Sequence, residues 1–341
     1  MSTPVEVLLT LTLPESVVEK IRQVSPQVRV TYHPAKKVED IPEDVWNRTE
    51  VMYTERLLPL PDQVPNLKWM QFMYAGIDFA VDAPLMKKPG LIVTHASGAM
   101  SPQVAEHAVA MILALGHHMP KMQSLKEKAE WPAPNVRWEK MAPVEVRGST
   151  VGLVGYGSIG REIARLLQPF GCTILAAKRD VMHPHDSGFT FTGQGDPEGD
   201  LFTRLYPIEA VGSMMKICDF VVLSLPLSPA TRGIIGTAEL ASMKPTAYLI
   251  DVGRGGVLDT DAILQCLQEK KIAGAALDVF EEEPLPATSP FWQLSNLIIT
   301  PHTAGVSVEF HERAGMVFVE NLNWYLAGDP LFNVYNTELG Y

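Results

Sequence analysis

A glycine-rich turn near the middle of the chain constrains the fold more than any other feature. The apolar stretch Val151–Val154 runs into Gly155-Tyr156-Gly157-Ser158-Ile159-Gly160, and a helical pattern follows over 161–167. In a turn of this spacing the first glycine permits the tight bend, the second lets a phosphate approach the backbone, and the third packs the helix against the strand. The following amides face an anion at a helix N-terminus. The segment predicts a parallel α/β fold that binds a dinucleotide. Its candidate binding residues are Gly155, Gly157, Ser158, Ile159 and Gly160.

Length and charge limit the classes of protein that remain. The 341 residues are too many for one ordinary core and suggest two domains. The formal net charge is −11 and no segment carries a block of Lys or Arg, so neither a nucleic acid nor an anionic membrane is an expected partner. No segment approaches the roughly 20 apolar residues of a membrane span, and no signal peptide is recognised at the N-terminus. We therefore expect a cytoplasmic protein.

The cysteines and histidines do not predict a metal site. Cys172, Cys218 and Cys266 lie far apart and lack metal-ligand spacing, which favours small buried side chains in a reducing compartment. The pair His183 and His185 is interpreted as part of a loop.

Strand-like and helix-like segments alternate along most of the chain, which predicts parallel sheets with helical crossovers. A helix is expected over Pro14–Val24, a single long linking helix over 101–125, an extended arm over 131–144, an exposed loop or hairpin insertion over 187–199, and an amphipathic helix over Glu309–Ala327. The tail 328–341 is expected to be a loop with apolar anchors at Leu331, Phe332, Val334 and Tyr341. The expected strands are Val5–Leu13, Val28–Tyr32, Leu67–Tyr74, Thr150–Val154, Thr173–Ala177, Phe220–Leu225, Ala247–Asp251, Gly274–Asp278 and Leu297–Thr300.

Three further motifs follow the glycine turn in a fixed order. They are Leu249-Ile250-Asp251-Val252-Gly253-Arg254-Gly255-Gly256, Ala276-Leu277-Asp278-Val279-Phe280-Glu281-Glu282-Glu283-Pro284-Leu285 and Thr300-Pro301-His302-Thr303-Ala304-Gly305. With the glycine turn and Val104-Ala105-Glu106, they resemble the D-isomer-specific 2-hydroxyacid dehydrogenase family, in particular its glyoxylate/hydroxypyruvate reductase-like members. The resemblance covers roughly residues 65–335 and is strongest between 150 and 305.

The resemblance implies a catalytic set of Arg254, Glu283 and His302. Reduction of a 2-oxo acid needs a cation for the carboxylate, a proton donor for the nascent alkoxide and a hydride held at the carbonyl carbon. A guanidinium binds a carboxylate bidentately, which suits Arg254. An imidazole titrates near neutral pH, which suits His302 as acid and base. Glu283, directly before the proline, would hold the second ring nitrogen.

Other positions match the family less specifically. The resemblance implies that Asp278 holds the nicotinamide amide, although a turn cap is the alternative. Ala75 and Gly76 resemble the loop whose amides receive the substrate carboxylate, with an ordinary strand-to-helix turn as the alternative. Pro226 and Thr231 resemble the loop beside the adenosine.

The resemblance also implies a division into two Rossmann-like domains. Residues 1–101 and 300–341 would form a flavodoxin-like substrate domain, and residues 102–299 a dinucleotide-binding domain with a doubly wound parallel sheet. A homodimer is expected by analogy with the family, with the linking helix and the arm in its interface.

The end of the second strand of the dinucleotide unit indicates which cofactor is used. NAD-preferring members carry an Asp there, about eighteen residues after the last glycine, which binds the ribose 2′-hydroxyl. This chain has Lys178 and Arg179, which should attract a 2′-phosphate, so we expect NADP to be preferred to NAD. Two alternatives stay open: Asp180 serves the 2′-hydroxyl, or the pocket discriminates weakly.

Three other functions share parts of this pattern. Formate dehydrogenases share the scaffold but have Gln in place of the Glu, which Glu283 argues against. Dinucleotide-sensing corepressors keep the catalytic set, although this chain is acidic and lacks a nuclear-type basic tract. L-specific lactate dehydrogenases carry the glycine turn near the N-terminus, unlike Gly155. The sequence does not name the substrate; glyoxylate and hydroxypyruvate are the default expectations.

Overall fold

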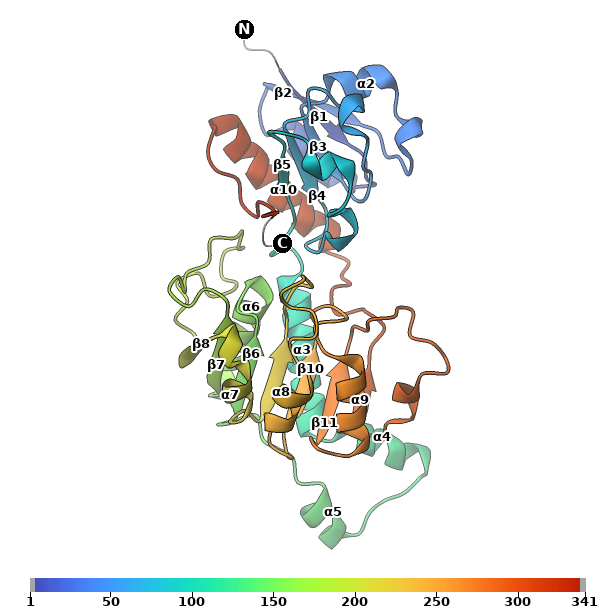
Figure 1. The fold of residues 1–341 in the computed structure, drawn as a ribbon, viewed down its shortest axis with the longest axis vertical. Coiled ribbons are helices and arrows are strands. Elements are labelled where there is room, and N and C mark those ends of the chain that lie inside the picture. Colours follow the sequence, from blue (N-terminus) through green and yellow to red (C-terminus); the bar gives the residue numbers. More distant parts are fainter. Residues whose placement is uncertain (1–3, 338–341) are drawn as a thin grey trace. The chain divides into compact units, whose positions relative to one another are not determined.

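The computed structural model describes residues 4–337, which form two compact units (Figure 1). The first unit contains the N-terminal segment through Met100, residues 187–189 and the chain from Val306 onward. The second unit contains 101–186 and 190–305. The predicted anchor at Tyr341 lies outside the described residues.

The sheet of the first unit is parallel, in the order β2-β1-β3-β4-β5. This is the flavodoxin-like order, and it confirms the predicted class. Its strands are β1 (Val5–Leu9), β2 (Val28–Tyr32), β3 (Val51–Thr54), β4 (Trp69–Phe72) and β5 (Ile92–Thr94). The α-helices of this unit are α1 (Glu15–Arg22), α2 (Glu43–Arg48) and α10 (Phe310–Ala327).

The core of the first unit depends on close packing of α10 on the sheet. Phe318 of α10 stacks on Tyr53 and Trp69 with ring centroids 4.5 and 5.1 Å apart, and all three side chains are fully buried. A side chain at Gly315 would run into Val17, so this glycine lets α10 pack directly against α1. The C-terminal helix is thereby part of the same core as the N-terminal strands.

The sheet of the second unit is parallel throughout, in the order β12-β11-β10-β9-β6-β7-β8. The order reverses between β6 and β9, as in dinucleotide-binding folds, where the ligand lies at the carboxyl ends of the strands beside that reversal. The strands are β6 (Thr150–Val154), β7 (Thr173–Lys178), β8 (Arg204–Pro207), β9 (Phe220–Leu223), β10 (Tyr248–Asp251), β11 (Gly274–Leu277) and β12 (Leu297–Ile299). The α-helices are α3 (Ser101–Gly116), α4 (Met119–Glu127), α5 (Pro134–Lys140), α6 (Ser158–Leu167), α7 (Val211–Met215), α8 (Thr237–Ser242) and α9 (Thr260–Gln268).

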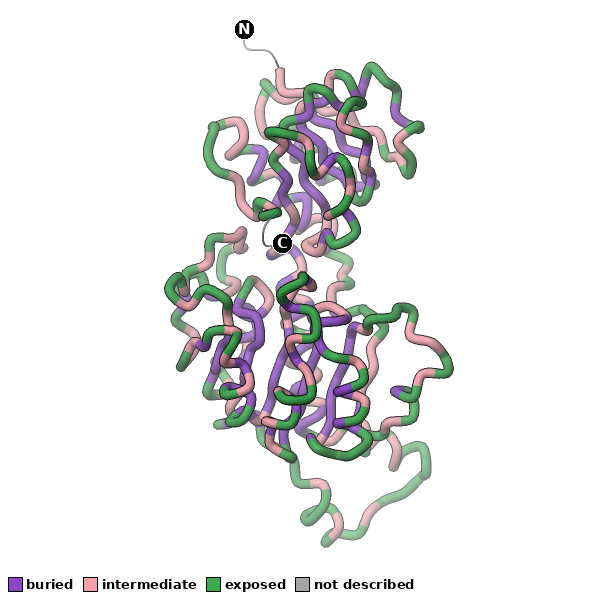
Figure 2. Tube along the Cα trace, in the orientation of Figure 1, coloured by how far each residue is buried: buried purple, intermediate pink, exposed green. Residues whose placement is uncertain are grey.

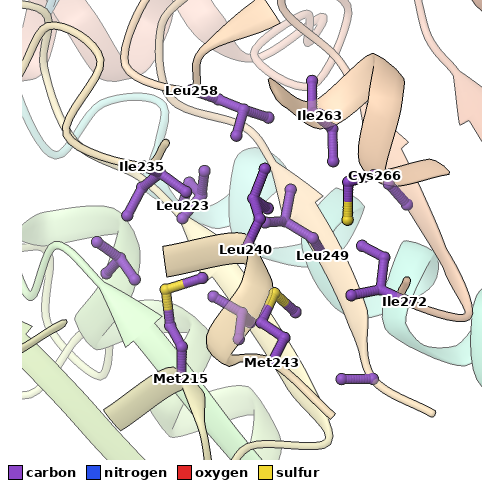
Figure 3. Close-up of a cluster of buried hydrophobic side chains, with 14 of the residues drawn as sticks. Met215, Leu223, Ile235, Leu240, Met243, Leu249, Leu258, Ile263, Cys266 and Ile272 are labelled. Atoms are coloured by element: carbon purple, nitrogen blue, oxygen red, sulfur yellow. The ribbon is translucent and has the colours of Figure 1, made fainter. Parts of the chain in front are cut away.

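Apolar side chains from strands and helices fill one face of this second sheet (Figure 3). Leu223 and Leu249 of the sheet meet Leu240 of α8 and Ile263 and Cys266 of α9 in one cluster. The inner strands β3, β4, β9, β10 and β11 are buried along their whole length, whereas the edge strands β2 and β8 are only partly buried and α4 and α5 are largely exposed (Figure 2).

Two sequence expectations about the region after Ser101 are wrong. The long helix ends at Gly116, His118 takes a left-handed φ of 54°, and α4 then starts with Pro120 in its first turn. Pro120 has no amide hydrogen to continue the helical ladder, which explains the break. The arm expected to be extended contains the helix α5, again with a proline in its first turn.

Other local expectations have mixed outcomes. The segment 187–199 is an irregular loop, which is one of its two predicted forms, but Asp196 within it is buried. Cys218 and Cys266 are buried as expected, but Cys172 is only half-buried; all three are free thiols. In the part of the chain that the structure describes, no helix is long and apolar enough to cross a membrane.

Candidate active site

The glycine turn fits a pyrophosphate. Gly155, directly after β6, has a φ of +101°, a conformation that side chains rarely adopt. A Cβ at Gly160 would collide with the carbonyl oxygen of Gly155, so the third glycine is needed for close packing of α6. A Cβ at Gly157 would meet nothing within 4 Å, so this position faces open space. Because α6 begins at Ser158, its first amides border that space, which is the geometry that the predicted anion site requires.

The end of β7 carries the two predicted cations. Lys178 is the last residue of the strand, and its Nζ donates to the carbonyl of His183 at 2.6 Å. Burial, followed by the charge of Arg161, lowers the pKa of Lys178. Arg179 is exposed. The Asp180 carboxylate bonds within its own turn, accepting from the Met182 amide at 3.0 Å and lying 2.7 Å from Nδ1 of His183.

The predicted adenosine loop after β9 is held by one hydroxyl. Oγ1 of Thr231 donates to the Pro226 carbonyl at 2.7 Å and accepts from the Ser228 amide at 2.8 Å. Thr231 is therefore an internal brace of the loop, and its side chain is buried.

The turn that carries Arg254 follows β10 and is tightly constrained. The Gly253 amide donates to Oδ1 of the fully buried Asp251 at 2.9 Å. A Cβ at Gly255 would overlap the Phe280 backbone, so this turn lies directly against the segment that leads to Glu283. Nη1 of Arg254 donates to the carbonyl of Gly253 at 2.9 Å, and the side chain is half-buried.

The Glu283 carboxylate and the His302 imidazole are in hydrogen-bond contact. Oε2 of Glu283 lies 2.7 Å from Nδ1 of His302, and Oε1 accepts from the Phe280 amide at 2.9 Å. The sequence predicts Glu283 in preference to its neighbours, and Glu281 pairs with Arg232 at 3.0 Å instead. With Nδ1 bound to the carboxylate, Nε2 of the imidazole is the nitrogen left to face a reactant.

Asp278 holds the turn in which His302 lies. One of its oxygens accepts from the Thr300 hydroxyl at 2.5 Å and the Thr303 amide at 2.9 Å, and the other accepts from the Ala304 amide at 3.0 Å. The amide of His302 donates to the Asp278 carbonyl at 2.9 Å, and His302 has a left-handed φ of 53°. The turn-cap interpretation therefore has direct geometric support, while a contact with nicotinamide stays a prediction.

The predicted substrate loop of the first unit follows β4. The Tyr74 carbonyl accepts from the Ala96 amide at 3.1 Å, which fixes the start of the loop containing Ala75 and Gly76. Arg56, which sequence reasoning did not select, lies beside this loop with its guanidinium over the rings of Phe79 and Tyr74, 4.5 and 5.8 Å from their centroids. One signal for Arg56 is present in the sequence. It is a cation two residues after the end of β3, which is the neighbour of β4 in the parallel sheet.

Comparison with known proteins identifies the family. Residues 109–304 match the family model described as D-isomer specific 2-hydroxyacid dehydrogenase, NAD binding domain. A glyoxylate reductase of Thermofilum pendens is 34% identical over 278 residues, which are 82% of this chain and 77% of the relative. The chain belongs to the D-isomer specific 2-hydroxyacid dehydrogenase family.

Related sequences and solved structures agree with this dehydrogenase assignment. A glyoxylate reductase of Aeropyrum pernix is 32% identical, over 84% of this chain and 82% of its own length. A family member from Xanthobacter autotrophicus Py2, solved with NADPH and MES, gives a TM-score of 0.79 at 25% identity, with both chains fully covered. An NADPH-dependent glyoxylate/hydroxypyruvate reductase of Sinorhizobium meliloti, solved with NADP and sulfate, gives a TM-score of 0.77 at 25% identity and covers 99% of this chain and all of its own.

The family predicted from the motifs is thus confirmed, and the chain is an NAD(P)-dependent 2-hydroxyacid dehydrogenase. Its predicted catalytic triad lies within the second unit, on the turns after β10, β11 and β12. Among the described residues there is no cluster of three or more His, Cys, Asp or Glu side chains that could hold a metal ion.

Proposed function

We propose that this dehydrogenase reduces a small 2-oxo acid, with glyoxylate or hydroxypyruvate as the first candidates, using NADPH. The observation that carries the proposal is the Glu283–His302 pair, whose turn is capped by Asp278 at the carboxyl edge of the dinucleotide-binding sheet. Relatives named glyoxylate reductase support the substrate class.

The proposed chemistry follows from the roles of three side chains. When bound, NADPH would supply the hydride for the carbonyl carbon of the oxo acid. Protonated His302 gives its Nε2 proton to the carbonyl oxygen, so that the product is the 2-hydroxy acid. Glu283 stabilises the imidazolium through Nδ1 and fixes the ring. Arg254 binds the substrate carboxylate and polarises the adjacent carbonyl.

The substrate is also proposed to contact the first unit. In this proposal the first unit is the substrate domain, and the second unit, which holds Arg254, Glu283 and His302, is the cofactor domain. The amides of Ala75 and Gly76 are the proposed substrate contacts of the first unit.

The preference for NADP rests on the end of β7. NAD-preferring members carry an Asp at this position, and its carboxylate would repel a 2′-phosphate. This chain has two cations there, Lys178 and Arg179, which would attract it. Asp180 is engaged by Met182 and His183 in its own turn, which favours the NADP proposal over service of a ribose 2′-hydroxyl.

We also propose that the dehydrogenase is a homodimer. The arm 131–144 exposes two large aromatic side chains, Trp131 at 87% and Trp138 at 82%, which a second copy of the chain would cover. Sedimentation equilibrium of the wild type and of Trp131→Ser/Trp138→Ser tests this, since a dimer should dissociate more readily when both are removed.

Steady-state kinetics test the enzymatic proposal. A panel of 2-oxo acids is assayed with NADPH and with NADH, before and after Lys178→Asp and Arg179→Ala, with the exposed Lys216→Ala as a control for loss of positive charge. Both test variants should lower the ratio of kcat/KM for NADPH to that for NADH, and the control should not. A ratio that neither test variant lowers contradicts the cofactor assignment. No turnover with any 2-oxo acid contradicts the substrate class.

A further inference from the structure

The segment 181–203, which lies between β7 and β8, is bound by a buried arginine of α6 that directly follows the glycine turn. Arg161, in the first turn of α6, is only 1% exposed. Its Nη1 donates to the carbonyl of Asp196 and its Nη2 to that of Pro184, both at 2.5 Å. Asp186 lies 3.6 Å from its Nε. A buried guanidinium is strongly destabilising unless such partners are held in place, so Arg161 fixes the segment at several points.

Tyr156 makes a second attachment from inside the glycine motif. Its buried hydroxyl donates to Oδ2 of Asp196 at 2.6 Å. The same carboxylate accepts backbone amides from Gly199, Asp200 and Leu201 at 3.1 Å each, so it organises the local turn of the segment. The Tyr156 ring also lies against the Arg161 guanidinium, 4.9 Å from its centroid.

A third attachment involves the next residue of α6. Oε2 of the buried Glu162 accepts from the Gly195 amide at 2.6 Å. Three residues of the glycine motif and α6 therefore bind the segment 181–203. They are Tyr156, Arg161 and Glu162.

The start of the segment determines where the charges at the end of β7 lie. The His183 carbonyl accepts from Lys178, and Asp180 is engaged by the Met182 amide and the His183 ring. Pro184, the next residue, is one of the two carbonyls that Arg161 holds. Lys178 and Asp180 are thus connected to Arg161 through the consecutive residues His183 and Pro184.

We propose that Tyr156, Arg161 and Asp196 are positioning residues for recognition of an adenosine 2′-phosphate. By fixing 181–203 on the glycine turn, they hold the Lys178 ammonium at the strand end and keep the Asp180 carboxylate within its own turn. The inference rests on the proposed preference for NADP and adds its physical basis: selection depends on the anchored segment as well as on the two cations. A purely structural role for the segment would instead affect all adenosine ligands alike.

The test uses the full-length protein and two probes that differ only in the 2′-phosphate, adenosine 2′,5′-bisphosphate and 5′-AMP, with Kd measured by calorimetry. Tyr156→Phe removes a single hydrogen bond to Asp196. It should weaken binding of the bisphosphate by about fivefold, and binding of 5′-AMP by less than twofold, because one net hydrogen bond is worth roughly 1 kcal/mol. Asp196→Asn provides a second variant with the same expected direction.

Tyr248→Phe is the matched control, because it removes a partly buried phenol hydroxyl that contacts His118 in the same unit. The inference is overturned if both probes weaken equally in the test variants, if neither weakens, or if the control gives the same selective loss. A wild type that binds 5′-AMP as tightly as the bisphosphate contradicts the proposed NADP preference itself, and the inference fails with it. The two failures are therefore distinguishable.

Discussion

Replacement of Glu283 by glutamine tests the proposed proton donor most informatively. The carboxylate accepts two hydrogen bonds with separate oxygens, one from the Phe280 amide and one from Nδ1 of His302. A glutamine amide has one oxygen, so it can accept from only one of these donors at a time. Because the Phe280 amide and the imidazolium both require an acceptor, Glu283→Gln leaves one of them without its partner.

The expected magnitude follows from the exposure of the pair. A hydrogen bond to a charged group contributes about 1.5–3 kcal/mol. The His302 and Glu283 side chains are 48% and 35% exposed, so solvent screening reduces the contribution to about 1–2 kcal/mol. If the loss is felt fully in the transition state, kcat for reduction falls about 5- to 30-fold.

The assay is kcat for reduction of a 2-oxo acid, with Glu282→Gln as the control that removes the same charge one residue away. Wild-type turnover in Glu283→Gln, or an equal loss in the control, would refute the reasoning.

Three further predictions follow. His302→Ala should lower turnover by about 10² to 10⁴ with little change in the Kd for NADPH measured by fluorescence titration, and wild-type turnover would exclude His302 as the proton donor. Arg254→Lys keeps the charge but loses the fork, so KM for the oxo acid should rise strongly and kcat should fall somewhat; a change in Tm alone would mark Arg254 as structural. Burial raises the pKa of Asp251 to about 7, above its value of about 3.9 in an unfolded chain, so its contribution makes the fold less stable as pH rises from about 4 to 7. Asp251→Asn should accordingly raise Tm relative to the wild type more at pH 8 than at pH 5, and an equal difference at both would contradict a neutral buried carboxyl.

Motifs that depend on local geometry were predictable from the sequence. The glycine turn requires Gly155 at positive φ and Gly160 at a close contact, and the structure shows both. The choice of Glu283 from three consecutive glutamates came from its place before Pro284, and the pairing with His302 agrees with it.

Contacts between distant segments were not predictable. Nothing in the sequence next to Asp196 indicates that Tyr156 and Arg161, 40 and 35 residues earlier, bind it. The strand β3 was missed because its four residues are all buried, so it shows no polar alternation. The break at His118 was missed because apolar spacing continued past a proline that ends the helix.

The most direct test of the central claim is the reduction of glyoxylate by the wild-type enzyme with NADPH or NADH as the only reductant. With two cations at the end of β7 and Asp180 engaged in its own turn, kcat/KM should be higher for NADPH, by about tenfold or more. A higher kcat/KM for NADH, or no oxidation of either cofactor by glyoxylate or hydroxypyruvate, would contradict the proposed function.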